Sequence, residues 1–298
     1  MTAGLWSPRR RPGTRRITGW RKLAGASWRA PSDPQFYGTM DVDAAALLDY
    51  VDRARAHTGV HLTVTHLLGR AVAHALREVP SLRVRLAFGR EHPRETVDVF
   101  FILTPEAGSG AGAGELSGVK VERADEKSAV QLGRELAGRA VAIAGGRDPE
   151  FGRTKRLLTV LPGPVLRRGI RLSAWLTSDL NLHLPRLGLP RQAFGGAMVT
   201  SVGMWDVGTA YSPLAAYYRV PVLVLVGTVQ PRPVARSGRV MARPTLTVTA
   251  TFDHRYVDGY SASRFAAAIR AYCAEPARHE PPLPAVPVPA PSAEQHQG

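Results

Sequence analysis

Residues 245–259 read Thr-Leu-Thr-Val-Thr-Ala-Thr-Phe-Asp-His-Arg-Tyr-Val-Asp-Gly. Apolar residues occupy the even positions from Leu246 to Phe252 and threonines occupy the odd ones, which is the alternation of a strand with one buried face. Asp258-Gly259 is a turn dipeptide, and we expect a helix to begin one or two residues later. If strand geometry persists for two residues past Phe252, His254 continues the apolar face and emerges from the end of the sheet toward a sheltered space.

His254 is therefore a candidate for proton transfer. A histidine between a strand end and a helix N-terminus is well placed to act as a general base, because its pKa lies near neutrality. The alternative is a buried histidine whose ring is held by a backbone carbonyl. The string Asp-His-Arg by itself does not distinguish between the two.

The composition excludes several classes of protein. The chain has 298 residues, of which 44% are hydrophobic and 21% charged, which is enough apolar content for a core. No apolar run exceeds five residues, whereas a spanning helix needs ~20. The single cysteine, Cys273, excludes a disulfide framework or a thiol cluster, and we expect no metal site. The start of the chain is basic but lacks the apolar stretch of a secretory signal, so a cytoplasmic location is expected.

The net charge of +15 is concentrated at the N-terminus. Eight basic residues precede the first acid, Asp33, and such an arm favours anionic partners. Because the sequence holds no zinc finger, RNP motif or basic zipper, we expect no specific nucleic-acid readout. We predict a basic disordered arm over 1–13, one domain over 14–275, and a proline-rich disordered tail over 276–298.

Local patterns predict the fold class. Ser128 and Gln131 have the spacing of a capping box, which predicts a helix that ends near Gly145. Helices alternate with strands in the first half of the chain, and strands cluster in the second half. This order predicts an α+β fold with a mixed β-sheet and helices packed on it. The predicted strands cover 97–104, 197–202, 220–229 and 244–252.

Two motifs resemble those of a known family. Asp253 to Gly259, in the form DHRxxDG, is similar to the signature of the dihydrolipoamide acyltransferases, the core components of 2-oxo acid dehydrogenase complexes. The related chloramphenicol acetyltransferases share its HxxxDG part. Met198 to Gly203 looks like the strand and turn that carry the catalytic serine or threonine in this family, with Thr200 at the hydroxyl position. The resemblance covers roughly residues 14 to 276 and implies the layered fold of chloramphenicol acetyltransferase.

The resemblance also implies roles for individual residues. His254 would be the general base and Thr200 the oxyanion donor, with Ser201 as the donor if the register shifts by one residue. Asp258, followed by Gly259, would be structural and would pair with an arginine from near the N-terminus. Arg29 is the candidate for that arginine, with Arg16 as the second choice.

The family further implies substrates and an assembly. Family members form trimers that bring the histidine and the hydroxyl together across a subunit interface, so a homotrimer or a larger cage is expected. The reaction would move an acyl group between coenzyme A and an acceptor thiol, less plausibly a hydroxyl or an amine. Neither a metal nor a covalently bound cofactor is expected, and a lipoyl group on a separate protein is a candidate acceptor.

Some features depart from the family pattern. The arm before Thr14 is too short for a lipoyl-bearing or subunit-binding domain, which favours a free-standing transferase. The stretch Glu115–Val121 differs from the usual strand and puts the lipoyl side of the channel in doubt. Residues 156–190 form an extra amphipathic segment, which would either pack on the core and cover the site or act as an interfacial anchor or partner groove.

Two other classes of function stay open. One is a non-catalytic trimeric scaffold with the same fold and a closed channel. The other is a basic adaptor that uses its N-terminal arm to bind nucleic acid or an anionic membrane. Peripheral membrane contact through residues 156–190 is a related alternative.

Overall fold

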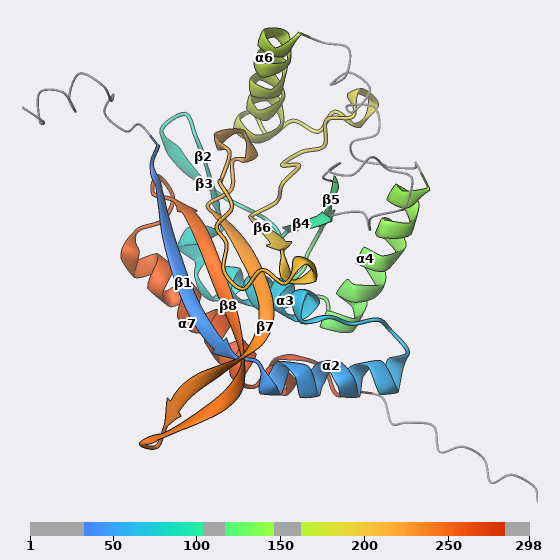
Figure 1. The fold of residues 1–298 in the computed structure, drawn as a ribbon. Coiled ribbons are helices and arrows are strands. Elements are labelled where there is room, and N and C mark those ends of the chain that lie inside the picture. The colour runs from blue at the N-terminus through green and yellow to red at the C-terminus, as the bar shows by residue number, and fades with distance from the viewer. Residues whose placement is uncertain (1–32, 104–116, 146–161, 284–298) are drawn as a thin grey trace, which may run out of the picture. The chain divides into compact units, whose positions relative to one another are not determined.

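A mixed six-stranded sheet forms the centre of the fold (Figure 1). The computed structural model describes residues 33–103, 117–145 and 162–283, which from Gln35 onward belong to one unit of the chain. The strand order is β1-β8-β7-β6-β4-β5. Neighbouring pairs β4–β6 and β6–β7 are parallel, and the other three pairs are antiparallel. The predicted mixed sheet is confirmed. Its strands are β1 (Gln35–Asp43), β4 (Val99–Leu103), β5 (Ser117–Val121), β6 (Ala197–Ser201), β7 (Val222–Arg236) and β8 (Arg239–Asp253).

Helices cover one face of this sheet, with α3 and α7 in contact with each other over it (Figure 1). A separate hairpin is formed by β2 (Val84–Ala87) and β3 (Arg90–Pro93). The helices are α2 (Ala45–Thr58), α3 (Val64–Glu78), α4 (Ala129–Ala144), α6 (Gly163–Ala174), α7 (Gly259–Ala274) and α8 (Pro276–His279). Short helical turns are η1 (Pro80–Leu82), η2 (Trp175–Asp179), η3 (Pro185–Leu187), η4 (Gly203–Trp205) and η5 (Ala216–Tyr218).

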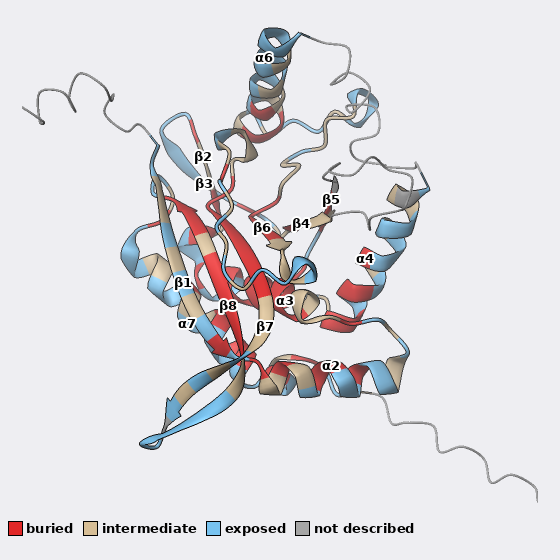
Figure 2. Cartoon of the chain, viewed as in Figure 1, coloured by how far each residue is buried: buried red, intermediate tan, exposed pale blue. Residues whose placement is uncertain are grey.

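The alternation in β8 divides its residues between the two faces as predicted. Leu246, Val248 and Phe252 belong to the core beneath the helices. The threonines face the other side, where the Oγ1 of Thr251 donates a hydrogen bond to the Ser212 carbonyl at 2.7 Å. This second face carries its own small apolar cluster of Phe100, Met198, Leu214, Val220 and Leu223. Both faces of the central strands are therefore buried (Figure 2).

Local sequence features account for two of the elements. Ser128 caps α4, because its side chain accepts from the Gln131 amide at 3.2 Å while the Gln131 side chain accepts from the Ser128 amide at 2.8 Å. The helix ends at Ala144, next to the predicted end. β7 and β8 join through Ser237 and Gly238, which both have positive φ angles of 51° and 77°. A two-residue turn with this backbone matches the right-handed twist of a hairpin.

The prediction places the start of the disordered tail too early in the chain. Residues 276–283 are packed on the domain: Pro276 begins α8 and is buried, and Glu280 is 6% exposed. Glu280 accepts a hydrogen bond from the Tyr272 hydroxyl at 2.6 Å and forms an ion pair with Arg70 at 3.3 Å. Proline is well tolerated in the first turn of a helix, so proline content alone did not indicate disorder here. Residues 284–298 lie outside the described part, as do the predicted arm 1–13 and Glu115.

Within the extra segment, α6 departs from the expectation of packing on the core, whereas η2 agrees with it. Residues 156–161 lie outside the described part. Helix α6 is mostly exposed (Figure 2), and its buried residue is Ala174 at the C-terminal end. Thr177 and Ser178 of η2 continue this buried end. Because Val165 and Leu172 are 49% and 55% exposed, α6 is anchored by its last turn and leaves an apolar stripe uncovered.

Candidate active site

His254 lies in a turn at the end of β8. The strand ends at Asp253, whose amide donates to the Pro221 carbonyl at 3.0 Å, so the last strand residue is tied to the residue that precedes β7. The Asp253 carbonyl then accepts from the amides of Tyr256 and Val257 at 2.9 and 3.1 Å. These bonds close the turn that contains His254, so the strand runs one residue past the predicted Phe252 and ends before His254.

An ion pair braces this turn on both sides of the histidine. The buried Asp253 carboxylate accepts from the Arg255 backbone amide at 3.0 Å and from its Nε at 3.0 and 3.1 Å. The hydrogen bonds that the Arg255 guanidinium donates to the Asp253 carboxylate raise the pKa of Arg255 above its ordinary value. Because the two residues flank His254 in sequence, their pairing restricts the backbone that presents the imidazole. Sequence reasoning noted this motif but did not assign the pair.

The imidazole is exposed in the single chain. Its ring lies 5.0 Å from that of Phe36 at an interplanar angle of 57°, and Phe36 stacks on Phe252 with ring centroids 5.0 Å apart. The His254 ring therefore lies on the same side of the sheet as the apolar face of β8, as predicted. The prediction that His254 faces a sheltered space is wrong for a single protomer. The strand ends before His254, and the turn exposes the ring to solvent.

Asp258 caps the helix that follows. Its Oδ1 accepts from the Ser261 amide at 2.8 Å, and Gly259 is the first residue of α7. The same hydrogen bond lowers the pKa of the exposed Asp258 carboxyl below its ordinary value. A carboxylate is also favoured at this position by the helix dipole. The predicted arginine partners, Arg29 and Arg16, lie outside the described residues.

Thr200 lies near the end of β6, in the middle of the sheet. The chain after it is tied to β7, because the Val202 amide donates to the Val226 carbonyl and the Thr228 amide to the Val207 carbonyl, both at 3.0 Å. Ser201 Oγ accepts from the Gly203 amide at 3.3 Å. Thr200 and Ser201 face opposite sides of the sheet, since successive strand residues alternate.

One chain does not bring Thr200 and His254 together. Thr200 is in register with Leu225, and Leu225 is in register with Thr249, five residues before His254. Two strand spacings of about 4.8 Å and five residues of about 3.3 Å separate their backbones by about 20 Å. The two side chains also lie on opposite faces of the sheet. Thr200 shares the face of Thr249, whereas His254 packs on Phe36 at the edge of the helix-covered face.

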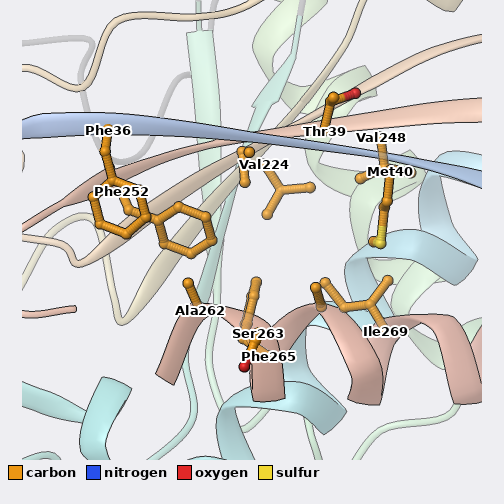
Figure 3. Close-up of a pocket in the computed structure, with 13 residues that line it drawn as sticks. Phe36, Thr39, Met40, Val224, Val248, Phe252, Ala262, Ser263, Phe265 and Ile269 are labelled. Carbon is orange, nitrogen blue, oxygen red and sulfur yellow. The ribbon is translucent and has the colours of Figure 1, made fainter. Parts of the chain in front are cut away.

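An apolar cavity of about 210 Å³ lies beside the histidine turn, between β1 and α7 (Figure 3). Phe36, which contacts the His254 ring, is one of its lining residues. Sequence reasoning missed this cavity because its walls come from β1, β7, β8 and α7, which are far apart in the chain. The small residues that leave it open carry no local pattern.

The single cysteine of the chain is not part of this site. Cys273 is fully buried in α7, and burial raises the pKa of its thiol to about 12. A thiol in this environment is a poor nucleophile, because the thiolate is the reactive form. Cys273 is instead a packed residue of the hydrophobic core. In the described ranges, no helix is both long and apolar enough to cross a membrane.

Comparison with known proteins identifies the family. The model for the 2-oxoacid dehydrogenases acyltransferase catalytic domain matches residues 15–101 and 190–279, which together are more than half of the chain. The chain belongs to this family. The stretch between the two matched ranges includes α6, so the exposed helix lies outside the residues that the family model matches.

Several known proteins are similar to the chain in sequence or in fold. The chain is 27% identical over 118 residues to the lipoamide acyltransferase component of the branched-chain alpha-keto acid dehydrogenase complex of Pseudomonas putida. That match covers 38% of this chain and 28% of the length of the relative. A probable dihydrolipoamide acetyltransferase from Listeria monocytogenes is 20% identical with a TM-score of 0.59, over 92% of this chain and 98% of that one. Dihydrolipoamide acetyltransferase of Azotobacter vinelandii is 20% identical with a TM-score of 0.61, over 83% of this chain and 84% of that one.

Proposed function

We propose that the chain transfers an acyl group between coenzyme A and the thiol of a dihydrolipoamide-like acceptor. The observation that carries this proposal is the braced turn that presents His254 at the end of β8 in a chain of this family. The acceptor sulfur attacks the thioester carbonyl while the His254 imidazole takes the thiol proton. The carbon–sulfur bond to coenzyme A then breaks, and the same proton passes to the departing coenzyme A sulfur.

A general base is required because the acceptor thiol is a weak nucleophile at neutral pH. A thiol with a pKa of about 8.5 is only a few per cent ionised at pH 7. Proton removal during attack contributes about 10²–10⁴-fold to the rate. The exposed position of His254 keeps its imidazole accessible to an incoming thiol. The Asp253–Arg255 pair holds the turn and is assigned a positioning role.

The hydroxyl of Thr200 is proposed as the donor to the oxyanion that forms on the carbonyl. Loss of one such donor costs about 10²–10³ in rate. The separation of about 20 Å within one chain means that Thr200 can serve His254 only from a neighbouring protomer. A cyclic homotrimer repeats this arrangement at each of its three interfaces. Ser201, which faces the opposite side of β6, is the alternative donor.

The substrates are proposed from the family. Coenzyme A thioesters would supply the acyl group, and a lipoyl group on a separate protein would accept it. The Azotobacter vinelandii enzyme was investigated for the roles of a serine, a histidine and an asparagine in its catalytic mechanism. That asparagine follows the histidine by four residues, as Asp258 follows His254 here. Asp258 is proposed to hold the loop, in keeping with its cap on α7.

The first test is acyl transfer from acetyl-CoA to dihydrolipoamide, followed by mass spectrometry of the acylated product. His254→Ala should reduce turnover by about 10²–10⁴-fold, because the general base is lost. His61→Ala replaces an exposed histidine elsewhere and is the matched control. Undiminished turnover in His254→Ala would refute the assignment of the base.

The second test addresses the shared site. His254→Ala and Thr200→Ala chains are each nearly inactive alone, but a mixed trimer can pair an intact His254 with an intact Thr200. Random mixing in equal amounts restores about one quarter of the sites. Each site needs the Thr200→Ala chain to supply His254 and the His254→Ala chain to supply Thr200. Co-expression should therefore recover about one quarter of the wild-type activity. A mixture with no more activity than its components would contradict the shared site.

A further inference from the structure

The cavity beside the histidine turn has an almost wholly apolar wall. Figure 3 shows β1 and β8 on one side and α7 on the other, with the rings of Phe36 and Phe252 at one end and Met40 and Ile269 at the other. Of the lining residues, Thr39 and Ser263 carry hydroxyls, and both residues are exposed and lie at the margin. A ligand in this cavity would meet hydrocarbon on nearly every side.

Small side chains keep the cavity open. The lining includes Gly38 on β1, Ala250 on β8, and Ala262 and Ala266 on α7. A Cβ added at Gly38 would meet the Phe252 ring at an ordinary distance of 3.6 Å, so a larger residue would fit there. Protein interiors are usually filled to the density of organic crystals. Unfilled space at the contact of a sheet and a helix is therefore space that a ligand can use.

The cavity is connected to the proposed catalytic turn. Phe36 lines the cavity and also lies 5.0 Å from the His254 ring. The helix that forms its floor, α7, begins at Gly259, only five residues after His254. β1 is the outermost of the described strands of the sheet, so the gap between β1 and α7 opens at the sheet edge. A chain held in the cavity thus has its end next to Phe36, close to the imidazole.

The size of the cavity limits what it can hold. A dry apolar cavity of about 150 Å³ is sufficient to bind benzene, which has six carbons. In proportion, a cavity of about 210 Å³ accepts about six to eight carbons. It has no charged lining residue, so it does not suit the phosphates or the adenine of coenzyme A. Its chemistry matches a hydrocarbon chain.

We propose that this cavity, here named the β1–α7 cavity, binds the acyl chain of a medium-chain acyl-CoA donor of about six to eight carbons. The inference rests on the proposed acyl transfer, because it places the thioester carbonyl beside His254 and the hydrocarbon chain between β1 and α7. The whole acyl group is transferred through its carbonyl carbon, and the cavity itself takes no part in the bonds that form or break.

The experiment compares acetyl-, butyryl-, hexanoyl- and octanoyl-CoA as donors to dihydrolipoamide with the full chain. Burial of each methylene favours the complex by about fourfold, so kcat/KM should rise steeply up to hexanoyl- or octanoyl-CoA. Ala266→Leu fills the cavity and should lower kcat/KM for octanoyl-CoA about tenfold or more relative to its effect on acetyl-CoA. Ala267→Leu makes the same change at the exposed neighbouring position and is the matched control.

A second variant and a binding measurement keep the inference testable on its own. Ala262→Leu fills the end of the cavity near the start of α7 and should reproduce the loss if Ala266→Leu does not fold. Calorimetric titration should show tighter binding of octanoyl-CoA than of acetyl-CoA, and Ala266→Leu should remove that difference. This result without transfer from any donor would leave the cavity assignment standing and refute the proposed function. Transfer from acetyl-CoA with no chain-length dependence, or with the same dependence in Ala266→Leu, would overturn the cavity assignment alone.

Discussion

Replacement of Glu280 should unfold the C-terminal end of the domain and lower its stability strongly. The carboxylate is buried and has three partners: the Tyr272 hydroxyl at 2.6 Å, the Ala129 amide at 2.6 Å and Arg70 Nε at 3.3 Å. It thereby joins α7, the first turn of α4, and α3. The Arg70 side chain is only 7% exposed, so Glu280→Ala leaves a buried guanidinium without its counter-charge.

The magnitude follows from that unpaired charge. Breaking a buried ion pair by removal of one partner costs about 3–5 kcal/mol. In a domain of this size each kcal/mol lowers Tm by about 2–4 °C, so we expect a fall of about 10 °C for Glu280→Ala. The double variant Arg70→Met/Glu280→Leu removes both charges and should recover much of the loss, because an apolar pair of similar volume is often neutral.

The assay is urea unfolding followed by circular dichroism at one fixed protomer concentration, since assembly also contributes to apparent stability. Burial raises the pKa of Glu280 above its ordinary value of 4.5. Between that value and the raised pKa the folded state binds more protons, so the free energy of unfolding should fall as pH rises through this window. Glu280→Gln should lose this slope. A Glu280→Ala chain within about 1 kcal/mol of wild type would refute the account of the buried pair.

Three further changes test other parts of the structure. His66 accepts from the Thr63 amide at 3.1 Å, and burial lowers its pKa to about 4. The unfolded state therefore binds more protons between pH 4 and 6.5, and the free energy of unfolding should drop by up to about 3 kcal/mol as pH falls through this range. His66→Gln keeps the capping box and should lose this drop. An unchanged pH slope in His66→Gln would contradict the assignment. Arg255→Met frees the histidine turn and should lower kcat about 10–100-fold, with KM for acyl-CoA changed little and partial rescue by Arg255→Lys; a loss confined to KM would argue against positioning. Gly227→Ala places a Cβ against the Gly208 carbonyl and should cost about 1–3 kcal/mol in urea unfolding, while Gly138→Ala, which meets open space in α4, should stabilise by about 0.5–1 kcal/mol; equal effects would show that the close approach is not real.

Sequence patterns predicted the parts of the fold that depend on neighbours in the chain. The capping box at Ser128 and Gln131 and the two faces of β8 rest on local hydrogen bonds or on strand alternation. The mixed sheet also followed from the order of the elements. These features need only a few residues to be specified, so the sequence displays them directly.

Features that depend on distant residues were missed or misplaced. The packing of residues 276–283 depends on Arg70, which precedes Glu280 by more than two hundred residues. The exposure of His254 depends on where β8 stops pairing with β1, and the β1–α7 cavity depends on small residues from β1, β8 and α7. The motif identified His254 and Thr200 as a pair, but the register between β6, β7 and β8 was needed to show that one chain holds them about 20 Å apart.

The pairing of β1 with β8 has a consequence for synthesis of the protein in the cell. Gln35 and Asp253 are register partners although 218 positions separate them. At about 5–20 residues per second, a ribosome needs roughly 10–40 s to extend the chain from one to the other. During that interval β1 is made but has no β8 to pair with, and its apolar side is available for incorrect association. Slow translation or limited chaperone capacity should therefore reduce the soluble yield more than it does for proteins dominated by local contacts.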